Sequence, residues 1–167
     1  HRRQLETHNA AMLANDFEAA IAMRKEAHQL AKKLNGGEPG ILAGPDAPGC
    51  RLDQVCAAEA GAIPIWGQSG VFIISAGEVS IAVEMEGVFG IGASSLPFLG
   101  FAVRSVDPAK PFLSDTGYRS FLGCTVEPQK GMTVERFVKR VIEVYVDREL
   151  RGKLVPVAER FRERCAL

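Results

Sequence analysis

The fold is decided by the stretch Val79–Met85, which reads VSIAVEM. Its odd-numbered positions are apolar, and serine, alanine and glutamate stand between them. Successive side chains of a strand point to opposite faces, so this period of two predicts a strand with one buried face and one solvated face. Such half-buried strands are typical of antiparallel sheets.

Further strands are expected around this one. Val71–Ser75 is β-branched and aromatic, and Ala76-Gly77 after it predicts a turn, so the two stretches should form a β-hairpin. Leu99–Val106 predicts another strand, and Phe89–Ile91 a short one. Ile63–Trp66 is a candidate edge strand, because Pro64 has no backbone N–H to donate and is therefore confined to the edge of a sheet.

The N-terminal block, Leu5–Leu34, is rich in good helix formers and is interrupted at Asn15-Asp16. Asparagine and aspartate are weak within helices and strong as N-caps. The block is therefore one helix of about thirty residues or two helices joined by a tight turn, and the interruption favours the helical hairpin. Asn35-Gly36-Gly37 ends it.

Two helices are expected at the C-terminal end. Thr133 is placed to cap a helix that alternates apolar and charged residues as far as Leu150. Pro156 suits the first turn of a last helix that reaches Cys165. Between the N-terminal block and the hairpin, a region rich in glycine and proline leaves room for one helical turn in Leu52–Ala60.

These elements predict an α+β fold: an antiparallel sheet of three to five strands with an N-terminal helix or helical hairpin and two C-terminal helices. The 167 residues fit one domain, in which residues 1–37 form an N-terminal helical segment and residues 38–167 the α+β core.

Residues 15–24, NDFEAAIAMR, resemble the UVR-type helical hairpin, whose pattern is D-F-E-x-A-x-x-L-R. Met23 stands where that pattern prefers leucine. The family uses this hairpin for protein–protein contact, so the resemblance implies a protein partner. The same motif also serves plain helix packing, since it supplies an N-cap, an aromatic and small residues. The rest of the chain resembles small uncharacterised bacterial proteins, which implies no particular activity.

Composition excludes some classes of protein. The chain has no apolar run of 18 residues and no recognisable signal peptide, so we expect a cytoplasmic protein without a membrane segment. The formal net charge is zero, although residues 1–37, 38–127 and 128–167 carry +2, −6 and +4. An acidic middle between basic ends could pair with itself, with a second copy or with an acidic partner.

Metal and cofactor chemistry has little support in the sequence. The cysteines Cys50, Cys56, Cys124 and Cys165 form no C-x-x-C pair, and free thiols are expected. The three histidines, His1, His8 and His28, all lie near the N-terminal end, without a metal-binding spacing. The glycine-rich stretch Gly87–Gly92 opens no helix, as a phosphate-binding loop would. We therefore expect no metal and no cofactor.

One loop gathers varied polar groups. The segment 111–124 begins PFLSDTGYRSFLG and lies in a stretch without periodicity. Asp-Thr-Gly matches the aspartic-protease triplet but lacks its apolar surroundings, and a turn explains it better. As a site, the loop would offer a carboxylate base, hydroxyl donors and an arginine for an anion. As a structural loop, its aspartate and arginine would pair with each other. The candidate ligand residues are Ser114, Asp115, Thr116, Tyr118, Arg119 and Ser120.

The sequence favours a non-catalytic protein-binding or regulatory module, with homodimerisation as one form of that role, because groups for catalysis are sparse. The alternative is a small enzyme or ligand-binding domain that uses the 111–124 loop. A third reading is weak nucleic-acid binding through the basic C-terminal helices.

Overall fold

A helical hairpin opens the chain, as predicted. The computed structural model describes residues 1–38, 43–44, 46–77, 79–89, 100–122 and 126–163. Helix α1 spans Arg2–Ala14 and helix α2 spans Phe17–Leu34. Asn15 ends α1 in the left-handed region at φ 66°, which asparagine tolerates. Asp16 then caps α2, since its side chain accepts a hydrogen bond from the Ala19 N–H at 3.0 Å.

Four antiparallel strands form the sheet in the order β1-β2-β3-β4. Their bounds are Gly70–Ala76, Val79–Met85, Phe101–Ser105 and Tyr118–Phe121. The decisive stretch is β2, and its odd-numbered side chains are buried as its period of two requires. β2 is a central strand, paired with β1 on one side and with β3 on the other. The α+β class and the antiparallel sheet are therefore confirmed.

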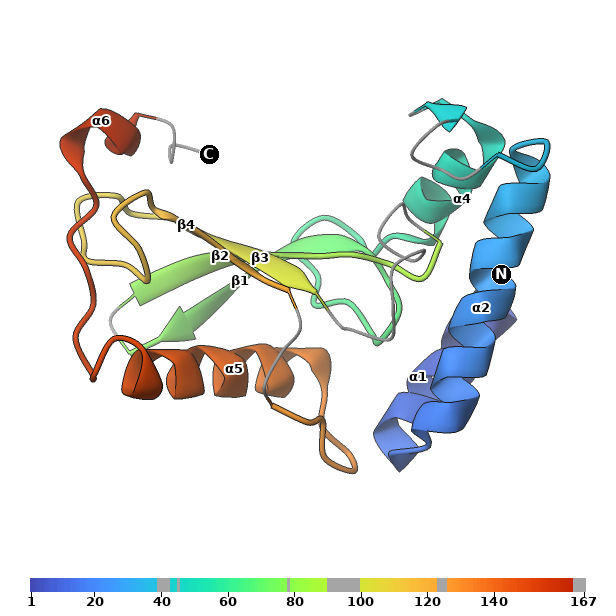
Figure 1. Ribbon diagram of the computed structural model, residues 1–167, viewed down its shortest axis with the longest axis horizontal. Helices are drawn as coiled ribbons and strands as arrows, with labels where there is room; N and C mark the ends of the chain where they lie inside the picture. Colours follow the sequence, from blue (N-terminus) through green and yellow to red (C-terminus); the bar gives the residue numbers. More distant parts are fainter. Residues whose placement is uncertain (39–42, 45, 78, 90–99, 123–125, 164–167) are drawn as a thin grey trace.

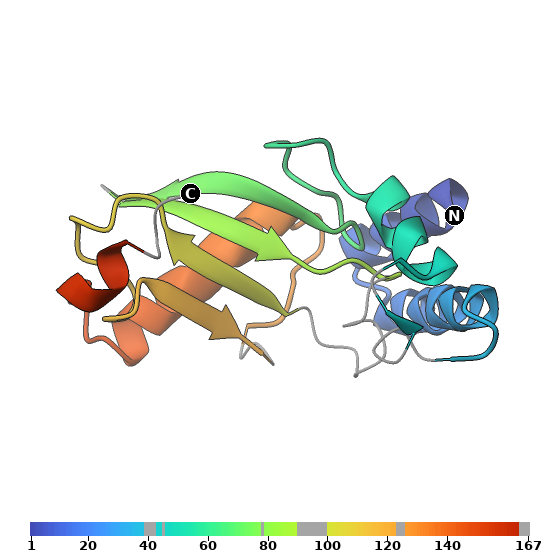
Figure 2. The same ribbon diagram turned by 90° about the horizontal axis from the view of Figure 1, so that it is seen from above.

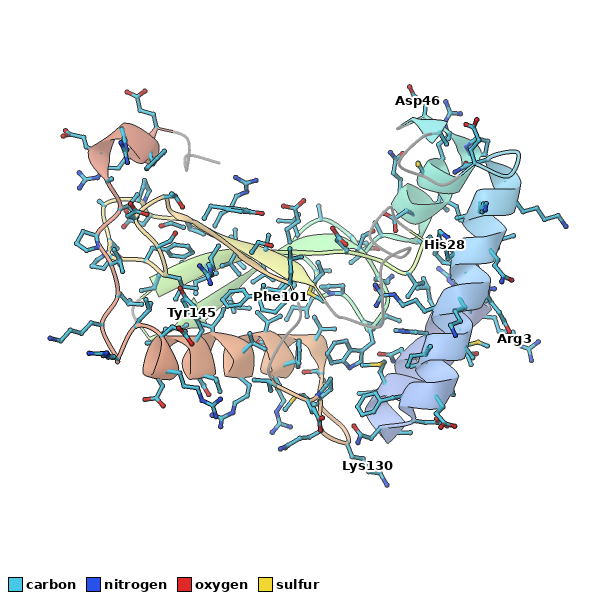
Figure 3. All side chains as sticks on the ribbon, in the orientation of Figure 1. Arg3, His28, Asp46, Phe101, Lys130 and Tyr145 are labelled. Atoms are coloured by element: carbon cyan, nitrogen blue, oxygen red, sulfur yellow. The ribbon has the colours of Figure 1, made fainter. Side chains whose placement is uncertain are left out.

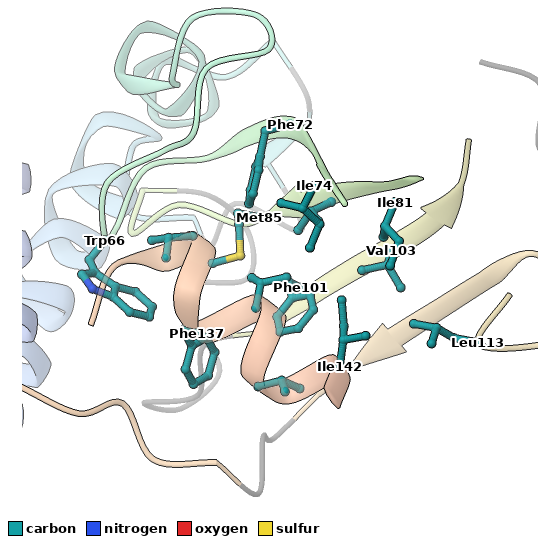
Figure 4. Packing of buried hydrophobic residues seen from close by; sticks show 14 of the residues in the cluster. Trp66, Phe72, Ile74, Ile81, Met85, Phe101, Val103, Leu113, Phe137 and Ile142 are labelled. Atoms are coloured by element: carbon teal, nitrogen blue, oxygen red, sulfur yellow. The ribbon is translucent and has the colours of Figure 1, made fainter. Parts of the chain in front are cut away.

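Helix α5, Val134–Arg148, covers one face of the sheet (Figures 1 and 2). Thr133 caps it, as predicted, by accepting from the Arg136 N–H at 3.4 Å. One stripe of the helix is buried against the sheet. Figure 4 shows its Phe137 and Ile142 pointing toward Phe101 and Val103 of the sheet. Burial of this stripe is the main source of stability for such a two-layer arrangement.

The helical hairpin stands at one end of the sheet (Figure 1). Ala11, Met12 and Ala20 from the hairpin belong to the same core as the sheet and α5. Helix α4, Pro48–Cys56, packs on α2, and a second, smaller apolar cluster there joins Leu5 to Cys56 and Phe89. The hairpin and the sheet thus share apolar contacts.

Two expectations about the irregular segments were wrong, and a third had different bounds. Tyr118–Phe121 lies in the stretch expected to be irregular, yet it forms strand β4 by pairing with β3. Ile63–Trp66 forms no strand. The expected helical turn at Leu52–Ala60 is helix α4, which begins at Pro48 and ends at Cys56.

The last helix is shorter than expected. Residues from Pro156 onward were expected to be helical, but α6 spans only Glu159–Arg162. The backbone of Val155 instead exchanges hydrogen bonds of 2.7 and 2.8 Å with Phe112. Val157 is buried at 2% exposure, so this segment is held extended against the core. The expected strand Phe89–Ile91 extends past the described residues, and its Phe89 lies in a bend.

Candidate functional site

The Ser114 and Thr116 hydroxyls of the candidate ligand loop are used within the loop. Ser114 Oγ donates to the Tyr118 carbonyl at 2.7 Å, and Thr116 Oγ1 lies 3.0 Å from the same oxygen. The two hydroxyls are also 3.0 Å apart. Gly117, at φ 69°, completes the turn and donates to the Ser114 carbonyl. This is the pattern of a serine- and threonine-stabilised turn.

Strand β4 separates the remaining members of the set. Arg119 faces α5, where its guanidinium carbon lies 4.6 Å from the ring centroid of Tyr145. Tyr118 points to the other side of the sheet, where the Arg104 guanidinium lies 4.8 Å from its ring. Such contacts are favourable cation–π geometries. Figure 3 places Tyr145 on the sheet-facing side of α5.

The six candidate residues therefore do not gather around one point. Ser120 follows Arg119 on the strand and pairs with Ala102, on the side of the sheet that carries Tyr118. Asp115 is exposed, and its backbone carbonyl accepts a hydrogen bond from the Ala158 N–H at 2.8 Å. The structure joins Ser114 to Thr116 and leaves Arg119 on the opposite face from Tyr118.

A cleft of about 530 Å³ lies near the start of this loop. Its walls come from the β1–β2 end of the sheet, from α5 and from residues 112–113 and 152–154. Phe112, Ile81 and Ile142 give it an apolar floor, whereas Glu143 and Asp147 lie at its rim. Its volume falls within the range of small-molecule sites. No local sequence pattern predicts this cleft, because its lining comes from segments far apart in the chain.

The junction between hairpin and sheet is centred on Trp66, the chain's one tryptophan. The Trp66 N–H donates to Asn9 Oδ1 at 3.1 Å, and its indole N–H donates to the Met132 carbonyl at 2.7 Å. His8 Nδ1 lies 3.1 Å from the Trp66 carbonyl. Gly67 must be glycine here, since it has φ 94° and a Cβ would lie 2.7 Å from His8 Nδ1.

Several titratable groups at this junction have shifted pKa values. Burial lowers the pKa of His8, which is 2% exposed, and burial also lowers the pKa of Arg24. Burial raises the pKa of Asp53, although a hydrogen bond from Ser69 opposes the shift. His8 and Arg24 line a cavity of about 10 Å³, which has room for roughly one water molecule. The cluster therefore holds the junction together and leaves no space for a larger ligand.

Apolar side chains are exposed on the sheet face opposite α5. The described helices leave its centre uncovered (Figure 1). Val71 is 53% exposed and Ile73 is 58% exposed on this face of β1, and Tyr118 on β4 is 40% exposed. Exposed apolar residues are normal singly, but neighbours on one strand indicate a surface that can be covered. We call this side the outer face and define it by Val71, Ile73 and Tyr118.

The free edge of β1 carries unpaired backbone groups. The Ser80 carbonyl accepts from the Val106 N–H at 3.3 Å, so Ser80 directs its backbone groups toward β3. Ser75 is the partner of Ser80 in β1 and therefore directs its own groups away from β2. By the same alternation, Val71 and Ile73 do so as well. Within the described part of the chain, these outward groups have no hydrogen-bond partner.

Sequence reasoning missed this edge, although its signal was present. Proteins usually protect edge strands with lysine, proline, a bulge or short length. β4 follows that rule, because it has four residues and includes Arg119. β1 reads GVFIISA over seven residues, without a charge or a proline. A seven-residue strand without a charged residue, next to a predicted hairpin turn, was the sequence signal of an unprotected edge.

The basic C-terminal residues are partly engaged. Lys139 pairs with Glu135 at 2.7 Å, and Arg140 pairs with Glu143 at 3.3 Å. Arg162 donates to the Val157 carbonyl at 3.2 Å. Nucleic-acid binding through this region stays a prediction, and Arg164, which belongs to the expected last helix, lies outside the described residues.

Metal-ligating and thiol groups can be compared only where the structure describes them. Within that part of the chain, no three histidine, cysteine or acidic side chains are grouped so that they could hold a metal ion. Cys50 and Cys56 are free thiols. The described helices include none that is long and apolar enough to cross a bilayer.

Within the described residues, the geometry defines an α+β protein with a helix on one face of its sheet, exposed apolar side chains on the other face and a free edge at β1. The chain is similar to two Escherichia coli proteins that carry the name Protein KlcB. One is 32% identical over 163 residues, which cover 95% of this chain and 37% of that protein. The other is 33% identical over 136 residues, which cover 81% of this chain and 28% of that protein. The chain thus spans about a third of the length of these curated relatives. No family model and no solved structure matches it.

Proposed function

We propose that this protein is a non-catalytic protein-binding module that receives an extended segment of its partner at the free edge of β1. The observation that carries the proposal is the unpaired edge itself, with outward backbone groups at Val71, Ile73 and Ser75. A peptide that adds a strand to such an edge gains main-chain hydrogen bonds, and pockets or apolar side chains beside the edge supply specificity. Val71 and Ile73 offer that apolar surface on the outer face.

The arrangement of the candidate loop supports a non-catalytic role. A general base, a hydroxyl donor and an anion clamp must converge within hydrogen-bond reach of one substrate. Here Arg119 and Tyr118 lie on opposite faces of the sheet, and the Ser114 hydroxyl is directed at a backbone carbonyl.

The resemblance of residues 15–24 to the UVR-type hairpin also points toward protein contact, and it stays a prediction. Two of its residues act inside this domain, since Asp16 caps α2 and Ala20 is 4% exposed. The hairpin's own contacts therefore already account for part of the motif. For this reason we place the partner at β1 and leave the hairpin as a second surface.

Site-specific photocrosslinking tests the proposal. p-Benzoylphenylalanine at Ile73 is expected to give covalent protein adducts when the full chain is irradiated in E. coli cells. The matched control is the same residue at Glu143 of α5, which is 64% exposed on the opposite side of the sheet. Adducts from position 73 and few from position 143 are expected. No adduct from position 73, or equal adducts from both positions, would overturn the proposal.

Ligand binding is the second candidate function. The cleft of about 530 Å³ favours it, and Phe112 and Leu113 of the cleft belong to the loop that the sequence singled out. The polar residues at its rim, Glu143 and Asp147, belong to α5, and the hydroxyl-bearing residues of the loop do not line it. A failure of photocrosslinking at Ile73 would leave this candidate as the better supported one.

A further inference from the structure

We infer that the partner strand is β1 of a second copy of this chain, so that two four-stranded sheets join into one continuous antiparallel sheet across a two-fold axis at Ile73. The inference rests on the proposed function, since it names the partner of the same edge. It commits to one register and to one pair of residues on the axis.

The backbone sets this register. The outward-directed groups belong to Val71, Ile73 and Ser75, and Ile73 is the middle one of the three. In an antiparallel pair, residues that exchange both hydrogen bonds lie directly opposite each other. A two-fold axis at Ile73 places it opposite Ile73 of the partner subunit, and Val71 opposite Ser75 of the partner subunit. Every outward group is then used, in about six interchain hydrogen bonds.

The strand's chemistry suits self-pairing. Like charges directly opposite each other destabilise a strand pair, and a two-fold axis places identical residues close together. β1 has no charged residue over Gly70–Ala76, so this repulsion is absent. The opposite edge differs, because Arg119 of β4 would approach its own copy in the equivalent pairing.

The side chains next to the axis complete the surface. Val71 and Ile73 are about half exposed on the outer face. The pairing brings the two Ile73 side chains together and places each Val71 opposite Ser75 of the partner subunit. On the inner side, Phe72 and Ile74 are already buried in the core, so they need no change. Ala76 lies on the inner side and lines the cleft, so the inner side of the strand is accessible at that end.

The size of the contact predicts a reversible dimer. A standard stable interface involves roughly 20–30 residues a side, and this contact is centred on one seven-residue strand from each copy. We therefore expect a dissociation constant of the order of micromolar, and a mass that rises with concentration. A permanent dimer would need a larger surface.

Sedimentation equilibrium of the full chain is the first test. The weight-average mass should rise from 18.0 kDa toward twice that value between about 1 µM and about 1 mM protein. Ile73→Lys places two ammonium groups together on the axis and should weaken association at least tenfold, while Ile73→Thr should weaken it less. Ser120→Lys is the matched control, because it adds the same charge to the outer face at the opposite edge and should leave association unchanged. Circular dichroism confirms that each variant is folded.

Disulfide trapping tests the register. Ile73→Cys should form an intermolecular disulfide under mild oxidation, since residues opposite each other in a strand pair are within disulfide range. Val71→Cys is the matched control: in this register it faces Ser75 of the partner subunit and lies too far from its own copy. The unsubstituted chain reports any crosslink through its native thiols. Equal trapping at positions 71 and 73 would overturn the register.

The outcomes separate this inference from the proposed function. A wild-type chain that stays at 18.0 kDa at every concentration overturns self-pairing. A dimer that is insensitive to Ile73→Lys overturns it too, because another surface must then hold the copies together. If photocrosslinking at Ile73 yields adducts with a different protein, the protein-binding function stands and the second copy is excluded as its partner. A chain that stays monomeric and gives no adduct from position 73 overturns both the self-pairing and the proposed protein-binding function.

Discussion

At the residue scale, His8 is the buried ionisable group that ties α1 to the sheet. It is 2% exposed, and its Nδ1 lies 3.1 Å from the Trp66 carbonyl. A carbonyl only accepts, so Nδ1 carries the proton and donates in this bond. Burial is the main cause of its lowered pKa; the hydrogen bond to Trp66 raises the pKa, and the charge of Arg24 lowers it further. His8 is therefore neutral in the fold near pH 7.

The lowered pKa predicts a loss of stability in mild acid. Below about pH 6.5 the unfolded chain binds a proton at His8 more readily than the folded chain does. The stability that neutral His8 contributes is thus present above that pH and is lost as the pH falls, by up to about 1.4 kcal/mol per unit. Urea unfolding followed by Trp66 fluorescence, between pH 7.5 and 5.5, should show a steeper loss for the wild type than for His8→Gln.

The control for this prediction is His28→Gln. This substitution leaves His8 and its contact with the Trp66 carbonyl in place, so the loss that His8 causes should persist in the variant. The raised pKa of Asp53 acts in the opposite direction, because protonation of that carboxyl favours the fold, but it is common to all three proteins. Parallel pH profiles for the wild type and His8→Gln would contradict the assignment.

At the scale of the element, the two sides of β1 predict opposite responses to truncation. Phe72 is 1% exposed between the sheet and α5, and Ile73 beside it is 58% exposed. Phe72→Ala removes a large buried ring and should lower the free energy of unfolding by about 3 to 5 kcal/mol. Ile73→Ala should lower it by about 1 kcal/mol or less, through lost β-propensity. Urea unfolding at a protein concentration well below micromolar measures both with little contribution from association. Similar losses of unfolding free energy for the two variants would contradict the assignment of Phe72 to the buried side of β1 and of Ile73 to its exposed side.

The elements also show where the sequence was informative. The period of two in Val79–Met85 and the interruption at Asn15-Asp16 are local signals, and the strand and the helical hairpin they predicted are present. Strand β4 has no such signal, because Tyr118–Phe121 becomes a strand only by pairing with β3. Val155 is extended because its backbone bonds to Phe112, more than forty residues earlier in the chain. Tertiary pairing overrides local preference in both cases.

The candidate site shows the same limit. Residue types alone identified a polar loop, but a serine or threonine hydroxyl serves a backbone carbonyl as readily as a ligand. Ser114 and Thr116 both lie within 3.0 Å of the Tyr118 carbonyl oxygen. Which residues of β1 direct their backbone groups outward depends on the pairing of Ser75 with Ser80, and that register is a property of the folded sheet.

At the scale of the whole molecule, the hairpin and the sheet behave as one packing unit. Met12 is 4% exposed within the core that also contains Phe137, and the Gly131 N–H donates to the Leu13 carbonyl at 2.8 Å. Trp66 adds bonds to Asn9 on one side and to Met132 on the other. These contacts cross between segments that the composition of the chain would divide at about residue 37.

Deletion of residues 1–37 should therefore destroy the fold of the remainder, since it removes apolar partners of the main core and leaves the Trp66 N–H and carbonyl without Asn9 and His8. In the full chain, Trp66 fluorescence reports the junction and far-ultraviolet circular dichroism reports the helices and sheet, and the two urea transitions should coincide as in a two-state domain. In the fragment we expect a red-shifted Trp66 emission and no cooperative transition. A fragment that unfolds cooperatively with buried Trp66 emission, or two separate transitions in the full chain, would show that the core folds without the hairpin, and the contacts at Trp66 would then join two domains instead of completing one.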